Sequence, residues 1–245
     1  MEIEIISEQE KEGVIATITP RKNELRRPKV CNIDQALLVF TLTQPAINYD
    51  LLDRMIILVE EQGLDIVICI NKIDIASKDE LDTLIKDYTK IGYKSITTSA
   101  ADNIGIEELL HSLQNKVSVF CGPSGVGKSS LLNRLAPWIN METGNLSKKN
   151  NRGKHTTRHT QLVKLCENSY IMDSPGFSSL FFDDINAEDL AQYFKEFRPF
   201  IDICRFNNCS HIKEPGCEIK AQVKLGHINE NRYDRYINLY SEIKP

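Results

Sequence analysis

The stretch "VSVFCGPSGVGKSSLLNRL", residues 117–135, predicts the kind of fold in which it lies. Residues 117–121 have strand character, residues 122–129 read "GPSGVGKS", and residues 129–135 have the pattern of a helix. The middle part fits the motif G-x-x-x-x-G-K-S/T, and a strand before it with a helix after it is the context that confirms the motif. The stretch therefore predicts a phosphate-binding loop in an α/β domain, rather than a glycine-rich turn with no binding role.

The chemistry of this loop suits the phosphates of a nucleotide. Successive backbone N–H groups and the positive end of the following helix can surround a phosphate group. Lys128 is expected to reach the β- and γ-phosphates, and Ser129 to ligate Mg²⁺. We expect nucleotide contacts from the loop and the start of its helix: Gly122, Pro123, Ser124, Gly125, Val126, Gly127, Lys128, Ser129 and Ser130.

A second motif, "DSPG", follows an apolar strand downstream of the phosphate loop. By itself Asp-Ser-Pro-Gly is also an ordinary turn. Its place after a strand and after the phosphate loop favours a nucleotide role. Asp173 is then expected to hold Mg²⁺ through water, and the Gly176 N–H to face the γ-phosphate.

The tetrapeptide "NKID", residues 71–74, follows the strand-like run 65–70 and predicts a guanine-reading loop. The Asp74 carboxylate can accept hydrogen bonds from guanine N1 and N2, which adenine cannot offer. Asn71 is expected at the opposite edge of the base, and the Lys72 stem along its face. Against adenine such a site leaves a buried carboxylate unpaired, which argues against an ATPase or a small-molecule kinase.

A short "TSA" segment, residues 98–100, follows the next predicted helix and strand, in the position of a loop that supports the base. The match is weak alone but its place in the order is right. The expected guanine contacts are Asn71, Lys72, Ile73, Asp74, Ser99 and Ala100.

The order of these motifs predicts a circularly permuted domain, because the base-reading loop precedes the phosphate loop, whereas in most GTP-binding proteins it follows. Circular permutation is compatible with such a fold, since its termini lie near the surface. Strands of four to seven residues alternate with helical patterns from residue 36 to residue 135. This alternation predicts a circularly permuted α/β domain with a mostly parallel sheet and helices on both faces.

A cysteine-rich segment, "CRFNNCSHIKEPGC", predicts a metal site near the C-terminus. Three thiolates and one imidazole make a closed tetrahedral zinc set, and four protein ligands indicate a structural ion. The alternative is three unrelated thiols and a surface histidine. The expected ligands are Cys204, Cys209, His211 and Cys217.

The remaining cysteines occur in apolar segments and are expected to be buried, and the odd total of seven favours a reducing compartment over a disulfide framework. They are Cys31, Cys69, Cys121 and Cys166.

The composition is that of an ordinary globular chain, with 41% hydrophobic and 26% charged residues, and no apolar run of membrane-spanning length. The net charge of −4 does not suggest nucleic-acid binding, but it hides two local basic clusters. Such clusters suit a phosphate backbone, although solvated surface charge is the ordinary interpretation. They comprise Arg21, Lys22, Arg26, Arg27 and Lys29, and Lys148, Lys149, Arg152, Lys154, Arg158 and Lys164.

The sequence resembles the circularly permuted small-ribosomal-subunit assembly GTPases, the RsgA family (also called YjeQ or YloQ). The resemblance covers nearly the whole chain. Besides the motifs above, it includes "PRKNELRRP", "NIDQ", "LLDR", "HTT" and "DSPGF". The resemblance implies an N-terminal OB-fold, a permuted GTPase domain at residues 29–182 and a mainly helical zinc domain at 183–245. Residues 1–28 are too few for a five-stranded barrel, so we expect only a partial, OB-like remnant of one or two strands.

The resemblance also implies a catalytic residue. Many GTPases place a water-positioning Gln just after D-x-x-G, but Phe177 stands there. His155, in "GKHTT", matches the catalytic histidine of the family, with rRNA contact as the alternative role. Thr156 or Thr157 is expected to ligate Mg²⁺.

The implied partners are GTP and GDP, the small (30S) ribosomal subunit and its 16S rRNA, for a cytoplasmic monomer with no membrane contact. The expected function is subunit-stimulated GTP hydrolysis late in 30S assembly. One alternative is an rRNA-binding scaffold that uses GTP only as a structural switch. Another is a large-subunit GTPase, although those relatives lack this cysteine cluster.

Overall fold

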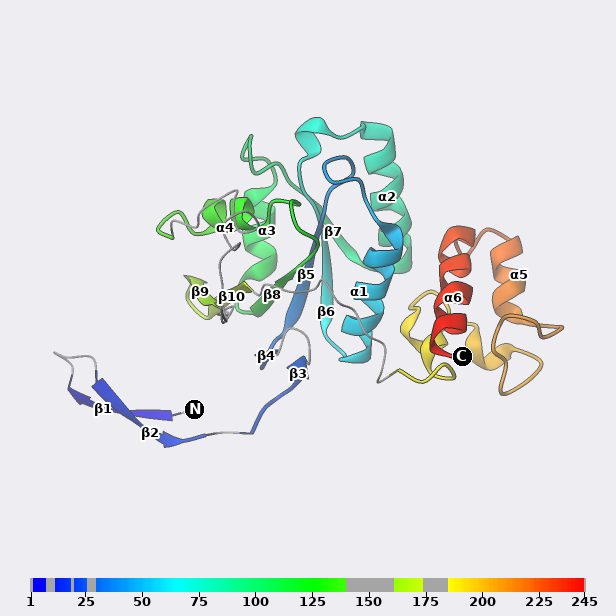
Figure 1. The fold of residues 1–245 in the computed structure, drawn as a ribbon, viewed down its shortest axis with the longest axis horizontal. Helices are drawn as coiled ribbons and strands as arrows, with labels where there is room; N and C mark the ends of the chain where they lie inside the picture. The colour runs from blue at the N-terminus through cyan, green and yellow to red at the C-terminus, as the bar shows by residue number, and fades with distance from the viewer. Residues whose placement is uncertain are drawn as a thin grey trace, which may run out of the picture.

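The computed structural model of the chain describes residues 2–7, 12–18, 20–25, 30–139, 161–173 and 185–244. Its central feature is a six-stranded sheet (Figure 1), with strand order β7-β6-β5-β8-β10-β9. All neighbouring pairs are parallel except β9 and β10, which confirms the mostly parallel sheet. The strands are β5 (Gln35–Phe40), β6 (Asp65–Ile70), β7 (Lys94–Thr97), β8 (Val117–Cys121), β9 (Gln161–Cys166) and β10 (Ser169–Asp173).

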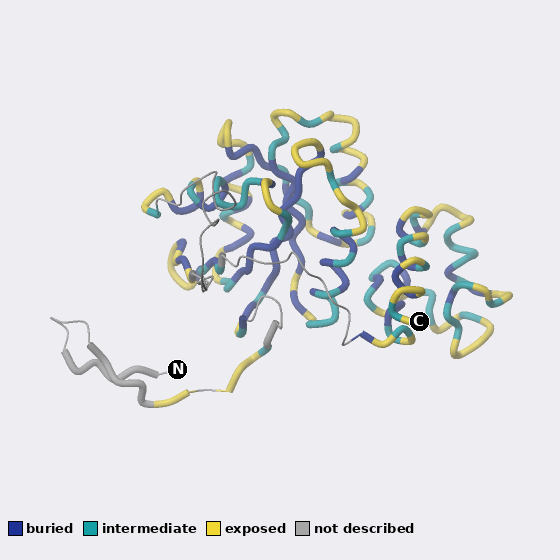
Figure 2. The backbone as a smooth tube through the Cα atoms, viewed as in Figure 1, coloured by how far each residue is buried: buried dark blue, intermediate teal, exposed yellow. Residues whose placement is uncertain are grey.

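Helices cover both faces of this sheet, as the continuous apolar strands predicted. Successive side chains of a strand point to opposite faces, so a strand buried on both sides feeds two cores. Leu38 and Phe40 of β5 pack in the core beneath α1 and α2. Leu37 and Val39 pack in the core beneath α3 and α4. All four residues are buried, and the strands of the central sheet are mostly dark blue in the burial view (Figure 2). The helices are α1 (Tyr49–Glu61), α2 (Lys78–Ile91), α3 (Ile106–Leu113) and α4 (Lys128–Leu135).

The N-terminal segment forms two short antiparallel pairs of its own. β1 (Glu2–Ser7) pairs with β2 (Glu12–Thr17), and β3 (Glu24–Leu25) pairs with β4 (Val30–Cys31). Asn23 joins the second pair to the start of the sheet, because its side chain bonds both the carbonyl and the N–H of Ile33. The predicted domain limits at residues 28 and 182 fall outside the described residues and stay predictions.

The described residues of the C-terminal region form helices joined by turns and irregular loops. The region contains the short 3₁₀ helices η2 (Leu190–Tyr193) and η3 (Ile201–Ile203), followed by α5 (Glu218–Lys224) and α6 (Glu230–Ile243). Its core is aromatic: the ring of Phe194 lies 5.0 Å from that of Phe197 and 5.2 Å from that of Tyr236. This core is separate from the two cores of the sheet, although Ile57 of α1 packs into it.

Two predictions about local structure were wrong. The spacing of Leu190, Tyr193, Phe194 and Phe197 predicts a helix, but Phe194 leaves the helical region with ψ of 98°. The four cysteines in apolar segments were expected to be buried, but Cys166 is exposed because it ends the edge strand β9, and Cys31 is partly exposed. Ser77 precedes α2 with an extended backbone, as a cap does, although its side chain makes no capping hydrogen bond.

The C-terminal region docks on α1 and α2 through buried charges. Arg232 of α6 donates hydrogen bonds to Asp53 of α1 and to Glu196, and Arg235 donates to the second oxygen of Asp53. The Tyr88 hydroxyl of α2 donates to Asp53 at 2.9 Å. Since every partner is largely removed from water, this network ties the two parts together. No helix in the described parts of the chain is both long enough and apolar enough to span a membrane.

Candidate nucleotide and metal sites

The predicted nucleotide motifs meet at one edge of the sheet. Strands β6 and β8 are separated only by β5 and run parallel, so the loops that follow them emerge side by side. Ligands of such sheets bind beyond the carboxyl ends of the strands. A cleft of about 480 Å³ lies there, lined by Asn71, Lys72, Asp74, Ala100, Ala101, Gly127, Ser130, Asn133 and Arg134.

Asn71 joins all three predicted loops and is fully buried. Its Nδ2 donates to the Val126 carbonyl of the phosphate loop at 2.9 Å. Its Oδ1 accepts from the Thr98 hydroxyl at 3.0 Å and from the Ala100 N–H at 3.3 Å. Asn71 therefore sets the relative position of the base and phosphate loops, and its predicted contact with the base stays a prediction.

Lys72 adds a second connection on the exposed side of the cleft. Its Nζ donates to the carbonyls of Gly125 at 2.7 Å and of Gln44 at 2.6 Å. Gln44 belongs to the loop between β5 and α1, and sequence reasoning missed it because a backbone carbonyl leaves no signal in the sequence.

Close packing explains one glycine of the phosphate loop. A Cβ at Gly127 would lie 2.4 Å from the Asn71 Nδ2 atom, and φ at Gly127 is 92°. Both the space and the backbone conformation therefore require glycine.

Asp74 is oriented by the supporting loop, as its predicted role requires. The Ser99 hydroxyl donates to Asp74 Oδ1 at 2.6 Å, and the Asp102 N–H donates to Ser99 Oγ at 3.1 Å. Ser99 and Ile104 also exchange two backbone hydrogen bonds that close this loop. The carboxylate is thus held in a fixed orientation at the edge of the cleft.

The phosphate loop links β8 to α4 in the predicted manner. Lys128 begins α4, and its Nζ donates to the carbonyls of Gly122 and Pro123, both at 2.7 Å. The ammonium group therefore lies over the loop. Asp173 ends β10 in register with Phe120 near the end of β8, which brings its backbone to the same edge. Gly176, His155, Thr156 and Thr157 lie outside the described residues.

Two residues of α4 line the cleft without having been predicted. Asn133 and Arg134 follow Ser130 by three and four positions, so helical spacing puts them on its side of α4. The Arg134 Nε donates to the Ala100 carbonyl at 2.8 Å, and its guanidinium also donates to the Ala101 carbonyl at 3.2 Å. Helical spacing from Ser130 was the available signal, but the motif pattern ends before these positions.

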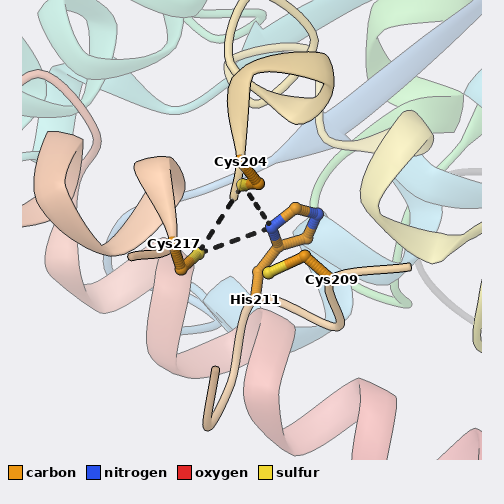
Figure 3. Close-up of side chains that lie close together, drawn as sticks. All are labelled: Cys204, Cys209, His211 and Cys217. Carbon is orange, nitrogen blue, oxygen red and sulfur yellow. Dashed lines mark hydrogen bonds between the residues drawn. The ribbon is translucent and has the colours of Figure 1, made fainter. Parts of the chain in front are cut away.

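The four predicted metal ligands come together in the C-terminal region (Figure 3). The ligand atoms of Cys204, Cys209, His211 and Cys217 all lie within 4.8 Å of one another. The Cys204 and Cys217 sulfurs are each 3.5 Å from His211 Nδ1 and 4.0 Å from each other. Tetrahedral ligands at the usual Zn–S distance stand about 3.8 Å apart. The cluster can therefore hold one metal ion.

The protonation chemistry of the cluster also suits a cation. Burial raises the pKa of Cys209 to about 12, so a positive ion is needed to hold the thiolate that binds metal. Burial lowers the pKa of His211 and favours the neutral imidazole, which is the form that ligates metals.

A single carboxylate organises the loop that carries two of these ligands. Glu214 accepts hydrogen bonds from the Ser210 N–H and hydroxyl and from the N–H groups of Ile212 and Lys213, at 2.6–3.2 Å. Burial opposes its charge, but these bonds outweigh burial and lower the pKa of Glu214 to about 2. The Tyr233 hydroxyl bonds the His211 carbonyl from α6.

Most of the predicted basic surface lies outside the described residues. Of its members, Arg21, Lys22 and Lys164 are described and exposed. Lys22 forms an ion pair with Asp34 at 2.7 Å.

Comparisons with protein families, with known proteins and with solved structures agree with one another on the family. A family model described as RsgA GTPase matches residues 18–183. The small ribosomal subunit biogenesis GTPase RsgA of Alkaliphilus metalliredigens is 47% identical, covering 100% of this chain and 84% of that protein. The protein of the same description from Bacillus subtilis is 42% identical, covering 97% and 81%.

Two solved structures are also similar. YjeQ from Thermotoga maritima has a TM-score of 0.82 at 38% identity, covering 96% of this chain and 80% of that one. YloQ, described as a circularly permuted GTPase, has a TM-score of 0.81 at 39% identity, covering 97% and 77%.

Proposed function

This chain belongs to the RsgA GTPase family, and we propose that it hydrolyses GTP in the assembly of the small ribosomal subunit. The observation that carries the proposal is the joining of the base-reading and phosphate loops by Asn71 and Lys72 in one cleft. On this proposal Asp74 is the carboxylate that selects guanine, and Lys128 is the lysine that binds the phosphates of the same nucleotide.

The proposed binding roles follow from the chemistry of the groups. Asp74 accepts the N–H groups of guanine, while Ser99 holds it in orientation. The backbone N–H groups of residues 124–130 would donate hydrogen bonds to the phosphates, and the Lys128 ammonium would offset their negative charge. Mg²⁺ bound with GTP would be held by Ser129, by Asp173 through water, and by Thr156 or Thr157. It would supply positive charge at the phosphate oxygens.

For hydrolysis we propose that His155 orients the attacking water. Phe177 stands where many GTPases have a water-positioning Gln, and its side chain can neither donate nor accept a hydrogen bond. We propose that the small subunit, through its 16S rRNA, stimulates this step, and that the chain acts as a cytoplasmic monomer. The zinc domain at residues 183–245 holds one structural Zn²⁺ through Cys204, Cys209, His211 and Cys217. Residues 1–28 contribute a partial OB-fold.

The decisive test changes the base reader. Asp74→Asn replaces an acceptor by an amide that can donate to the 2-oxo group of xanthine. GTP affinity should fall by a factor on the order of 10²–10⁴, and xanthosine triphosphate should become the preferred ligand. Asp82→Asn is the matched control, because it removes the same charge from an exposed position on α2.

Equilibrium binding of both nucleotides measures the switch. Unchanged guanine preference in the Asp74 variant would exclude NKID as the base reader. Turnover with and without small subunits then separates a hydrolase from a scaffold that holds GTP as a structural switch, since the scaffold would show no stimulation.

A further inference from the structure

We propose that Arg134 is a positioning residue of the nucleotide site, which sets how long a guanine nucleotide stays bound by holding the base-supporting loop, residues 98–102, against α4. The proposal rests on the function proposed above and extends it to a residue outside the nucleotide motifs.

The first observation is that the base-supporting loop is held from two sides. On one side, the Ala100 N–H donates to Asn71 of the base-reading loop. On the other side, the Arg134 guanidinium donates to the carbonyls of Ala100 at 2.8 Å and Ala101 at 3.2 Å. One side chain thus bonds two consecutive carbonyls through two different nitrogens of its planar guanidinium.

The second observation is where these groups lie. Ala100, Ala101 and Arg134 line the same cleft as Lys72 and Asp74. The Ser99 hydroxyl of the base-supporting loop also donates to Asp74, so a base held by Asp74 would lie beside the loop that Arg134 holds. Arg134 also comes from the helix whose first residues bind the phosphates, so it fixes the distance between the base and phosphate ends of the site.

The third step is energetic. A loop already held in its binding conformation loses less freedom when a ligand binds, which strengthens binding without any new contact. Without Arg134, the carbonyls of Ala100 and Ala101 are no longer bonded to α4, and the loop beside the base is held less rigidly. The phosphate loop keeps its own bonds from Asn71, Lys72 and Lys128. Loss of Arg134 should therefore weaken ligands that carry a base and spare ligands that consist of phosphate alone.

The experiment uses the full chain loaded with zinc and a fluorescent N-methylanthraniloyl GDP displaced by excess GDP in a stopped-flow instrument. Arg134→Ala should raise the dissociation rate about five- to twentyfold, because Arg134 is exposed and its bonds are only partly shielded from water. Arg134→Lys should give an intermediate rate.

Arg198→Ala is the matched control. Its side chain likewise bonds a carbonyl, that of Gln192 at 2.8 Å, and a carboxylate, that of Glu60, but it is absent from the cleft lining. Its GDP dissociation rate should match the wild type. Tripolyphosphate, which has phosphates but no base, should compete equally well for wild type and Arg134→Ala.

Each outcome has a defined meaning. A GDP dissociation rate within twofold of the wild type in Arg134→Ala would overturn the inference. So would an equal loss of tripolyphosphate and GDP binding, since that would mark a general disturbance of α4. If Arg134→Ala does not fold, Arg134→Met keeps the apolar stem and takes its place. Failure of both to fold would show a structural role and also overturn the inference. A wild-type chain that does not prefer GDP over ADP would instead refute the proposed function.

Discussion

Replacing Arg232 by Met should destabilise the chain far more than any exposed charge change. Arg232 and Asp53 have side chains only 2% and 3% exposed, and Asp53 also accepts from Arg235 and Tyr88. Removing Arg232 takes the guanidinium away from the buried carboxylate of Glu196 and leaves Asp53 with Arg235 and Tyr88. Breaking a buried charge pair in this way costs about 3–5 kcal/mol. Met fills most of the volume of arginine, so the loss reports the charge rather than a cavity.

Arg54→Met is the control within the same interface. Arg54 also joins α1 to α6, through Glu242, but these side chains are 28% and 53% exposed. An ion pair of that kind contributes about 0–1 kcal/mol. The two substitutions thus make the same chemical change between the same two helices and differ mainly in burial.

Urea unfolding of the zinc-loaded chain, followed by far-ultraviolet circular dichroism, measures both free energies of unfolding. The two packed parts need not unfold together, so each unfolding curve is also examined for more than one transition. Combining Arg232→Met with Asp53→Asn should cost less than the sum of the single changes by about 1–3 kcal/mol. Equal effects of Arg232→Met and Arg54→Met would refute the reasoning.

Three further predictions concern the metal region and catalysis. Cys209→Ser should release zinc and unfold the C-terminal region while nucleotide binding persists, and elemental analysis that finds no zinc in the wild-type chain would contradict it. Glu214→Gln should cost about 1–2 kcal/mol near neutral pH, since an amide accepts fewer hydrogen bonds. Because the pKa of Glu214 falls from 4.5 to about 2 on folding, its contribution is complete above about pH 4.5 and is lost toward pH 2, so thermal unfolding of the two chains should converge over that window. His155→Ala should lower subunit-stimulated hydrolysis by a factor on the order of 10²–10⁴ with GTP affinity nearly unchanged, and an unchanged single-turnover rate with subunit binding intact would remove His155 from the mechanism.

The fold class, and the loops that meet at the cleft, could be predicted from the amino-acid sequence without coordinates. Strands such as residues 65–70 are buried on both faces and therefore read as continuous apolar runs, which are visible without coordinates. The loops that follow them need special chemistry at fixed spacing: glycine where Asn71 approaches Gly127, and a carboxylate at Asp74. The cluster of metal-binding side chains was predictable for the same reason, because its four members lie within 14 consecutive residues.

The contacts between segments that are far apart in the sequence could be identified only from the folded structure. Asp53 and Arg232 are 179 positions apart, and each taken alone is an ordinary charged residue of an amphipathic helix. Arg134 and Gln44 belong to the site only because folding brings α4 and the β5–α1 loop beside the base-reading loops. The segment around Phe194 has helical spacing, yet aromatic packing against Tyr236 is satisfied there by a short 3₁₀ turn. Local sequence patterns indicate which face of a helix or strand is buried. Which other element packs against that face depends on the arrangement of all the elements together.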